Sequence, residues 1–143
     1  MKAWNSIESS WMNSLTRGQQ PSHANLREHL VMVHRDHAGF AENCALRCLD
    51  GSGLNSYQQL ASVVDPDKHM HLLDLACGSG VLLEICRQRC GGSAKITGVD
   101  MSKEELALAR QRNPDPSVTL HHGIAQDLSF IDDCEFDVVL CHW

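Results

Sequence analysis

The chain is 143 residues long, carries a formal net charge of -6 and is 43% hydrophobic, which suits one compact domain with a core of its own. The acidic balance leaves no basic stripe to neutralise a phosphate backbone, so the composition disfavours a nucleic-acid partner. No apolar run approaches the roughly 20 residues of a membrane span, and no apolar segment follows Lys2, so we expect neither a membrane protein nor a secretory signal.

The first 69 residues are predicted to be helical. An apolar stripe at helical spacing opens the chain and is formed by Trp4, Ile7, Trp11 and Leu15. Two interpretations of this stripe are open: it packs on the core or on a neighbouring chain, or it belongs to a mobile flap over a bound ligand.

Turn-forming residues divide the rest of this region. After a break, Ser22 is placed to cap a helix that runs through Val33, or onward past Gly39 to Cys48. A second turn follows, and residues 57–64 are predicted as a short helix that an Asp-Pro pair ends.

From residue 70 onward the pattern alternates between strands and helices. Strands are predicted over residues 70–75, 95–99, 117–121 and 136–141, and helices over 79–90 and 102–112. Such strand–helix–strand connections are right-handed and build an open parallel sheet. The last strand is apolar throughout, which is typical of a parallel strand covered on both faces. We therefore expect an α/β fold with a helical N-terminal cap over residues 1–69 and a parallel-sheet domain over residues 70–143.

A capping box is predicted at the start of the second of these helices. Ser102 can accept a hydrogen bond from a free backbone amide, and Glu105 can reach back to the amide of Ser102.

Two segments carry the chemistry of a ligand site. In HLLDLACGSG, residues 71–80, an apolar strand ends near Asp74 and turns through small residues into a helix, as a parallel strand does when it brings a nucleotide-like ligand to a helix N-terminus. Twenty residues after Gly80, a second strand ends at Asp100, whose carboxylate can accept hydrogen bonds from two ribose hydroxyls. Together the segments predict a site for an adenosine-containing cofactor.

Three motifs, LLDLACGSG, GVDMS and FDVVLCHW, resemble those of the S-adenosylmethionine-dependent methyltransferases of class I, the Rossmann-like class, over about Leu72 to Trp143. The resemblance implies strand order 3-2-1-4 with S-adenosylmethionine at the carboxyl ends of the strands. It also implies a methyltransferase, and the acidic charge and the N-terminal helices, which often cover the active site in this family, favour a small-molecule methyl acceptor.

The family's sheet has more strands than the four predicted here. By the resemblance, the chain is the N-terminal, cofactor-binding portion of a methyltransferase, with a truncated Rossmann-like sheet. The strand over residues 136–141 is then expected to form an exposed apolar edge, where it can pair with a second copy or with a partner that supplies the missing half.

The resemblance assigns most cofactor contacts to the turn after the first strand and to two acids. Small residues let the ligand approach this turn closely, and the turn consists of Ala76, Cys77, Gly78, Ser79 and Gly80. The thiol of Cys77 is expected to point away from the ligand.

Asp74 is expected to hold the ammonium group of the methionine tail, directly or through water, and hydrogen bonds to backbone amides of the loop are the other role open to it. Asp100 is expected to bind the ribose hydroxyls by charge-assisted hydrogen bonds, with capping of the next helix as its alternative role. Met101 would flank the adenine with a polarizable side chain.

The stretch after the third strand departs from the family pattern. Where the family often has Gly-Asp-Ala, this chain has Gly123, Ile124 and Ala125. Ile124 would give the adenine an apolar wall without an acceptor, and Ala125 would offer its backbone amide. Asp127 is the candidate for the missing acceptor.

The end of the fourth strand is expected to reach the reacting groups. By the resemblance, Cys141 lines the methionine tail and Trp143 forms a wall of the acceptor pocket. His142 is a candidate general base, because imidazoles titrate near neutral pH.

Two other functions are open at this point. A non-catalytic cofactor-binding or interaction module of the same fold is favoured by the truncation and by Ile124. A nicotinamide-dependent oxidoreductase also uses a glycine-rich turn followed by an acid, but its G-x-G-x-x-G pattern requires glycine where this chain has Leu83.

Seven cysteines and nine histidines raise the question of a metal site. His34 and His37 share a helix face but have no ligand partners nearby in the sequence. Two cysteine pairs lie four residues apart, unlike the C-x-x-C knuckles of zinc sites, namely Cys44 with Cys48 and Cys86 with Cys90. We therefore expect no metal, reduced thiols and a cytoplasmic protein.

Overall fold

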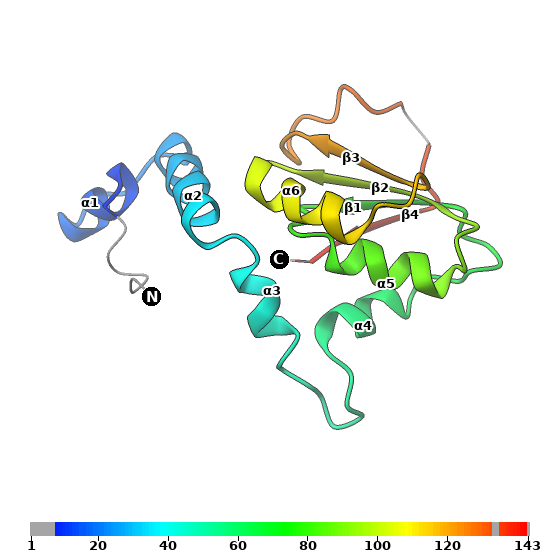
Figure 1. Ribbon diagram of the computed structural model, residues 1–143. Coiled ribbons are helices and arrows are strands. Elements are labelled where there is room, and N and C mark those ends of the chain that lie inside the picture. The colour runs from blue at the N-terminus through cyan, green and yellow to red at the C-terminus, as the bar shows by residue number, and fades with distance from the viewer. Residues whose placement is uncertain (1–7, 133–134, 143) are drawn as a thin grey trace. The chain divides into compact units, whose positions relative to one another are not determined.

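The computed structural model describes residues 8–132 and 135–142 (Figure 1). It divides into two compact units, Met1–Ala38 and Gly39–Trp143, which are described separately below. The predicted boundary at residues 69 and 70 follows the change of sequence pattern, and it stays a prediction. None of the helices in the described ranges has the length and apolar character needed to cross a membrane.

The first unit is a pair of helices, α1 (Ser10–Thr16) and α2 (His23–His37). The Ser9 side chain caps α1, and Ser22 caps α2 as predicted, accepting a hydrogen bond from the backbone amide of Asn25 at 3.2 Å. The two helices meet where the Trp11 ring stacks on His29, with ring centroids 4.9 Å apart.

This contact accounts for part of the predicted apolar stripe. Trp11 packs on α2 within the unit, whereas Leu15 is 45% exposed. Trp4 and Ile7 lie outside the described residues.

The second unit begins with two short helices, α3 (Phe40–Ala45) and α4 (Ser56–Ala61). The alternative of one helix running past Gly39 to Cys48 is wrong, because Gly39 adopts a left-handed φ of 73° between α2 and α3. Asn55 caps α4 and pairs reciprocally with Gln58.

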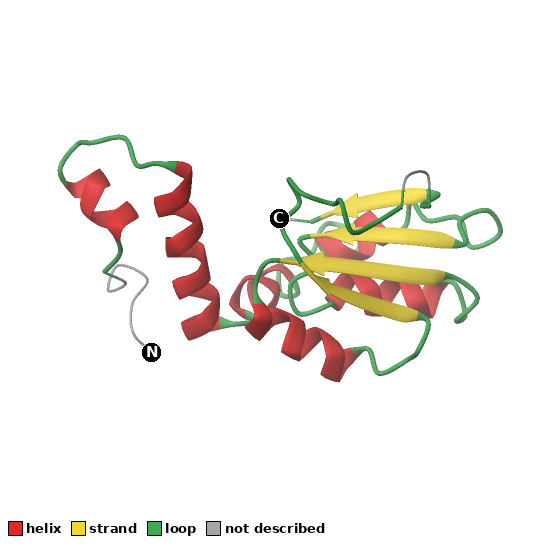
Figure 2. Cartoon of the chain, turned by 90° about the horizontal axis from the view of Figure 1, so that it is seen from above, coloured by secondary structure: helices red, strands yellow, loops and turns green. Residues whose placement is uncertain are grey.

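The four predicted strands form one parallel sheet of order β3-β2-β1-β4. Their bounds are β1 (His71–Leu75), β2 (Lys95–Asp100), β3 (Val118–His122) and β4 (Val138–Cys141). This confirms the predicted α/β class and strand order. Because every strand points the same way, the carboxyl ends of all four meet at one edge of the sheet (Figure 2).

Helices α5 (Val81–Arg89) and α6 (Lys103–Arg112) connect the first three strands, and with α4 they cover one face of the sheet (Figures 1 and 2). The core lies between this face and the helices. Its fully buried side chains include Leu72, Leu82, Leu83, Ile96 and Leu106.

The other face of the sheet carries no helix in the described part of the second unit (Figure 2). The loop after β3 folds back so that Phe130 packs on His121, with ring centroids 5.4 Å apart. Val139 of β4 is 57% exposed. The prediction that the fourth strand is covered on both faces is therefore wrong for the described residues.

Half of the predicted capping box is present at α6. The Ser102 hydroxyl accepts from the Glu105 amide at 3.2 Å, as expected. The reverse bond is absent, because Asp100 Oδ1 takes the Ser102 amide at 2.8 Å. Glu105 Oε1 instead accepts from the backbone amide of Gly39 at 2.9 Å, which ties α6 to the start of α3.

Candidate functional site

The turn between β1 and α5, residues 76–80, forms a tight loop that we call the glycine loop. Ala76, Gly78 and Gly80 all have left-handed backbones, with φ of 59°, 52° and 78°. Glycine adopts this conformation freely, whereas alanine is strained in it. The Cys77 amide donates to the Val99 carbonyl at 3.0 Å and so ties the loop to β2.

Close contacts explain why the loop has small residues at two positions. A Cβ on Gly78 would lie 2.7 Å from Glu42 Oε1, and a Cβ on Gly80 would lie 2.6 Å from Asn113 Nδ2. Asn113 follows α6, and its Nδ2 donates to the Gly80 carbonyl at 3.0 Å. It therefore ties the loop to the end of α6, a role that its position after a predicted helix did not indicate.

Asp100 links the glycine loop to α6. It is 7% exposed, its Oδ2 accepts from the Gly78 amide at 2.9 Å, and its Oδ1 accepts from the Ser102 amide. Met101, next in the chain, is half-buried. These bonds hold the Asp100 carboxylate at the carboxyl end of β2, beside the loop.

Asp74 is a buried acid without a partner. It is 3% exposed, and neither carboxylate oxygen has a hydrogen-bond partner among the described residues. The loop-anchoring role considered for it is therefore absent from this structure. Burial, followed by the negative charge of Asp100, raises the pKa of Asp74 to about 8.

Glu42 of α3 was not among the predicted site residues. It is 6% exposed, its Oε1 accepts from the Ser79 amide in the glycine loop, and its Oε2 is buried without a partner. Burial raises the pKa of Glu42, and the hydrogen bond to Ser79 opposes that rise. Its pairing with residue 79 joins positions 37 residues apart, so no local sequence pattern could have found it.

The Cys77 thiol points away from the open side of the loop. The side chain is 6% exposed, and its Sγ lies 2.9 Å from where a Cβ on Gly98 would be. Burial raises the thiol's pKa, so the reactive thiolate is disfavoured.

The segment after β3 lies beside Asp100, because the Gly123 amide donates to the Asp100 carbonyl at 3.0 Å. Ile124 is half-buried, and Ala125 is exposed. The Asp127 amide closes this turn on the Ile124 carbonyl at 3.0 Å, while its carboxylate accepts from the Ser129 amide at 3.2 Å.

The end of β4 approaches α4. Cys141 is exposed. The His142 ring stacks on Tyr57 with centroids 3.9 Å apart, and its Nε2 lies 2.8 Å from Ser56 Oγ. Burial raises the pKa of Tyr57, and the charges of Glu42 and Asp74 add to the rise, so both acids lie within electrostatic range of this phenol. Trp143 lies outside the described residues.

A family model described as "Methyltransferase domain" matches residues 72–143, half of the chain. The chain belongs to this methyltransferase family. An amino pentose methyltransferase from Micromonospora echinaspora, solved with S-adenosylmethionine bound, matches at a TM-score of 0.52 and 31% identity, over 72% of this chain and 42% of that one. The class I, S-adenosylmethionine-dependent family that the three motifs indicated is thereby confirmed.

Two curated relatives resemble about half of the chain. The 2-phytyl-1,4-beta-naphthoquinone methyltransferase of Arabidopsis thaliana is 40% identical over 75 residues, 48% of this chain and 28% of the relative. The dTDP-3-amino-3,6-dideoxy-alpha-D-glucopyranose N,N-dimethyltransferase of Streptomyces fradiae is 39% identical over 74 residues, 52% of this chain and 26% of the relative. The chain thus spans less than a third of the length of either relative.

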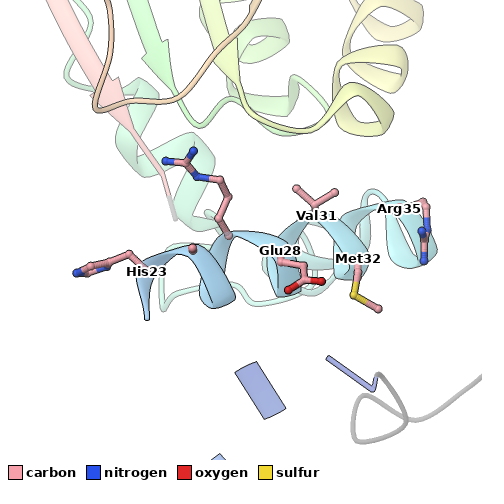
Figure 3. Close-up of a pocket in the computed structure, with 7 residues that line it drawn as sticks. His23, Glu28, Val31, Met32 and Arg35 are labelled. Carbon is pink, nitrogen blue, oxygen red and sulfur yellow. The ribbon is translucent and has the colours of Figure 1, made fainter. Parts of the chain in front are cut away.

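The described residues contain no group of three or more acids, cysteines or histidines able to hold a metal ion. Their six cysteines are all free thiols. A hollow of about 630 Å³ runs along α2 in the first unit (Figure 3). All seven side chains that line it come from that one helix, between His23 and Arg35, and none of them is a predicted site residue.

Proposed function

We propose that this chain carries the cofactor-binding part of an S-adenosylmethionine-dependent methyltransferase that acts on a small-molecule acceptor. The single observation that carries the proposal is the buried Asp74 carboxyl beside the glycine loop, with both oxygens unpartnered. A buried acid in this condition is costly, and the ammonium group of the cofactor's amino-acid end would provide the missing donors.

The other predicted residues complete the site in this proposal. Asp100, held by the Gly78 and Ser102 amides, keeps lone pairs for the ribose hydroxyls. The glycine loop gives the ligand a close approach, with Met101 and the turn at Ile124 and Ala125 around the adenine. Cys141 then borders the amino-acid end.

When bound, the cofactor supplies a methyl group on a sulfonium, whose leaving group is a neutral thioether. The chain's own contribution is to hold and orient the reacting groups. His142 is the candidate base for an acceptor that must lose a proton. Ser56 and Tyr57 of α4 fix the imidazole by the hydrogen bond and the ring stacking already described.

The acceptor class follows from the chain's charge and from its relatives. A net charge of -6 suits a small molecule better than a nucleic acid. The two relatives are named for a naphthoquinone and a nucleotide-linked amino sugar, which are both small molecules.

Isothermal titration of the chain with S-adenosylhomocysteine and with NAD tests the cofactor. We expect the homocysteine compound to bind and NAD not to bind. Asp100→Ala should weaken binding by about 1.5–3 kcal/mol, the range for a hydrogen bond to a charged group, while Asp132→Ala, at an exposed acid, should not.

A folded chain that binds neither ligand would contradict the proposal. Unchanged affinity in Asp100→Ala would remove this residue from the site.

A second candidate function is a non-catalytic module that binds the cofactor or a partner. It is favoured by Ile124, which stands where the family often has an acid. Transfer of a labelled methyl group from S-adenosylmethionine to a quinone or amino-sugar acceptor by the purified chain would exclude it.

We further propose that the outer edge of β4 pairs with a second copy of the chain. Support comes from its place at the edge of the sheet and from Val139, which is 57% exposed. A cytoplasmic setting is also proposed, supported by the free thiols among the described cysteines.

A further inference from the structure

Two buried carboxylates reach the glycine loop from different parts of the second unit. Asp74 belongs to β1, at the start of the loop, whereas Glu42 belongs to α3, outside the residues that match the family model. Asp74 is 3% exposed and Glu42 is 6% exposed. Both carboxyl groups are therefore buried, where water screens their charge little.

Only one of the two carboxylate oxygens of Glu42 has a hydrogen-bond partner in the described chain. Its Oε1 accepts from the Ser79 amide and would collide with a side chain on Gly78, so the carboxylate lies directly against the loop. Its Oε2 is buried and has no hydrogen-bond partner in the described chain. Buried polar atoms are nearly always paired in folded proteins, so an unpaired carboxylate oxygen points to a missing donor.

The charges around Glu42 do not supply that donor. Glu105 of α6 lies close enough to raise the pKa of Glu42, and Arg112 of α6 lowers it only as a minor contribution. The Arg112 guanidinium is itself turned to Glu84, with Nε 3.8 Å from Oε2. Within the described ranges, no ion pair to Glu42 or Asp74 occurs. The loop is thus bordered by two buried carboxyl groups that have no cationic partner in the described chain.

We propose that Glu42 is a further residue of the cofactor site, whose free oxygen accepts a hydrogen bond from the ammonium group at the cofactor's amino-acid end, together with Asp74. This inference rests on the proposed cofactor. It extends the site beyond residues 72–143 into α3, and it predicts that the loop recognises the ammonium group of a zwitterionic amino-acid end rather than a phosphate. Dinucleotide sites use such loop amides for pyrophosphate, whereas here the Ser79 amide already holds a carboxylate.

The test compares two ligands that differ at the amino-acid end. S-adenosylhomocysteine has the ammonium group, and 5′-methylthioadenosine has the same nucleoside thioether without the amino acid. Calorimetry measures the Kd of each for the full chain and for the variants Glu42→Gln, Glu42→Asp and Glu135→Gln. Glutamine keeps an acceptor for the Ser79 amide but replaces the free oxygen by an uncharged NH2 group, which cannot accept from an ammonium group. Glu135 is an exposed control.

We expect Glu42→Gln to weaken S-adenosylhomocysteine by roughly tenfold, the scale of one charge-assisted hydrogen bond, and to leave 5′-methylthioadenosine within about twofold. Glu42→Asp keeps the charge, so the ratio of its two Kd values should be nearer to the wild-type ratio than that of Glu42→Gln. Thermal unfolding without ligand verifies that each variant is folded.

Three results would overturn the inference while leaving the proposed function intact. Equal weakening of both ligands would mean that Glu42 only shapes the loop, and tighter binding by Glu42→Gln would mean that Glu42 competes with the cofactor. If Glu42→Gln does not fold, equal weakening of both ligands by Glu42→Asp would do the same. Failure of the wild-type chain to bind either ligand would instead overturn the proposed function itself.

Discussion

Among single residues, the buried Asp74 carboxyl links the stability of the second unit to pH. Its pKa lies at about 8 in the folded chain, against an ordinary value of 3.8. Between these values the folded state keeps a proton that the unfolded state releases. The folded state therefore binds more protons in this range, and the free energy of unfolding falls as pH rises.

Replacing the acid by its neutral analogue removes this penalty. We expect Asp74→Asn to raise the free energy of unfolding at pH 8 by about 2–4 kcal/mol, with a smaller gain at pH 5. Urea unfolding at both pH values measures the difference. Asp132→Asn, at an exposed acid, serves as the control. A gain for Asp74→Asn that is the same at both pH values would show that Asp74 does not titrate in this range.

Ala76 is a second residue with a testable effect on stability, because its backbone conformation is strained. It is exposed and has a φ of 59°, the only positive φ of a non-glycine residue in the described chain. The left-handed conformation costs an L-residue about 1–2 kcal/mol, and a glycine would relieve this strain. The greater flexibility of glycine in the unfolded chain offsets about 0.5–1 kcal/mol of the gain.

Ala76→Gly should therefore stabilise the chain by about 0.5–1 kcal/mol, measured by thermal and urea unfolding. Ala125→Gly, at an exposed alanine outside the left-handed region, should instead lower stability. A loss of stability in Ala76→Gly comparable to that in Ala125→Gly would argue that the strain is relieved elsewhere.

Among elements, the approach of α5 to the end of α6 depends on the absence of a side chain at Gly80. A Cβ there would lie 2.6 Å from Asn113 Nδ2 and 3.2 Å from Ala109 Cα, and φ is 78°. Backbone at Ala109 cannot move aside as a flexible side chain can.

Gly80→Ala should cost about 2–4 kcal/mol of unfolding free energy, from strain and overpacking together. Gly92→Ala provides a matched control, because Gly92 has the same φ of 78° but open space around it. The control should lose only about 1–2 kcal/mol. Equal losses at the two positions would mean that the packing of α5 on α6 adapts to the extra methyl group.

The elements of the sheet could be predicted because their signals are local. Apolar runs, the acid at Asp100 and the small residues of the loop all lie within short windows, and they predicted the strands and the loop. The strand order came from the resemblance to the methyltransferase family. The contacts missed are those between distant segments: Glu42 with Ser79, Asn113 with Gly80, and Glu105 with Gly39 are 37, 33 and 66 residues apart.

The half of the predicted capping box that is absent has a different origin, a local competitor for the Ser102 amide. A local pattern assigned the Ser102 amide to Glu105, but Asp100 lies closer in sequence and takes that amide at 2.8 Å. Glu105 is thereby released for Gly39. The break at Gly39 belongs to the same contact, since a helix continuing through it could not present its amide to α6.

For the whole molecule, the sheet leaves β4 at an edge with one face open. Val139 is 57% exposed there, and an exposed apolar edge strand favours pairing with another chain. If two copies pair along β4, a lysine at this position should hinder the contact by its charge and its hydration.

We expect the sedimentation coefficient of the wild-type chain to rise with concentration as two copies associate. Val139→Lys should lower the association constant fitted to that rise by roughly tenfold. Val63→Lys, at a valine that is 58% exposed in the same unit, controls for general surface hydrophobicity. A wild-type chain that sediments as a monomer at all concentrations would contradict pairing along β4.

The exposed thiol at the end of β4 gives this edge a natural attachment point for a spectroscopic label. Cys141 is accessible, whereas Cys77, Cys86 and Cys90 are buried in the core. With Cys44, Cys48 and Cys134 replaced by serine, a maleimide fluorophore would mark the chain at one position, between the sheet edge and the His142 contact with α4. The same molecule could then report, by its emission, both on ligand entry at the carboxyl ends of the strands and on the meeting of two chains.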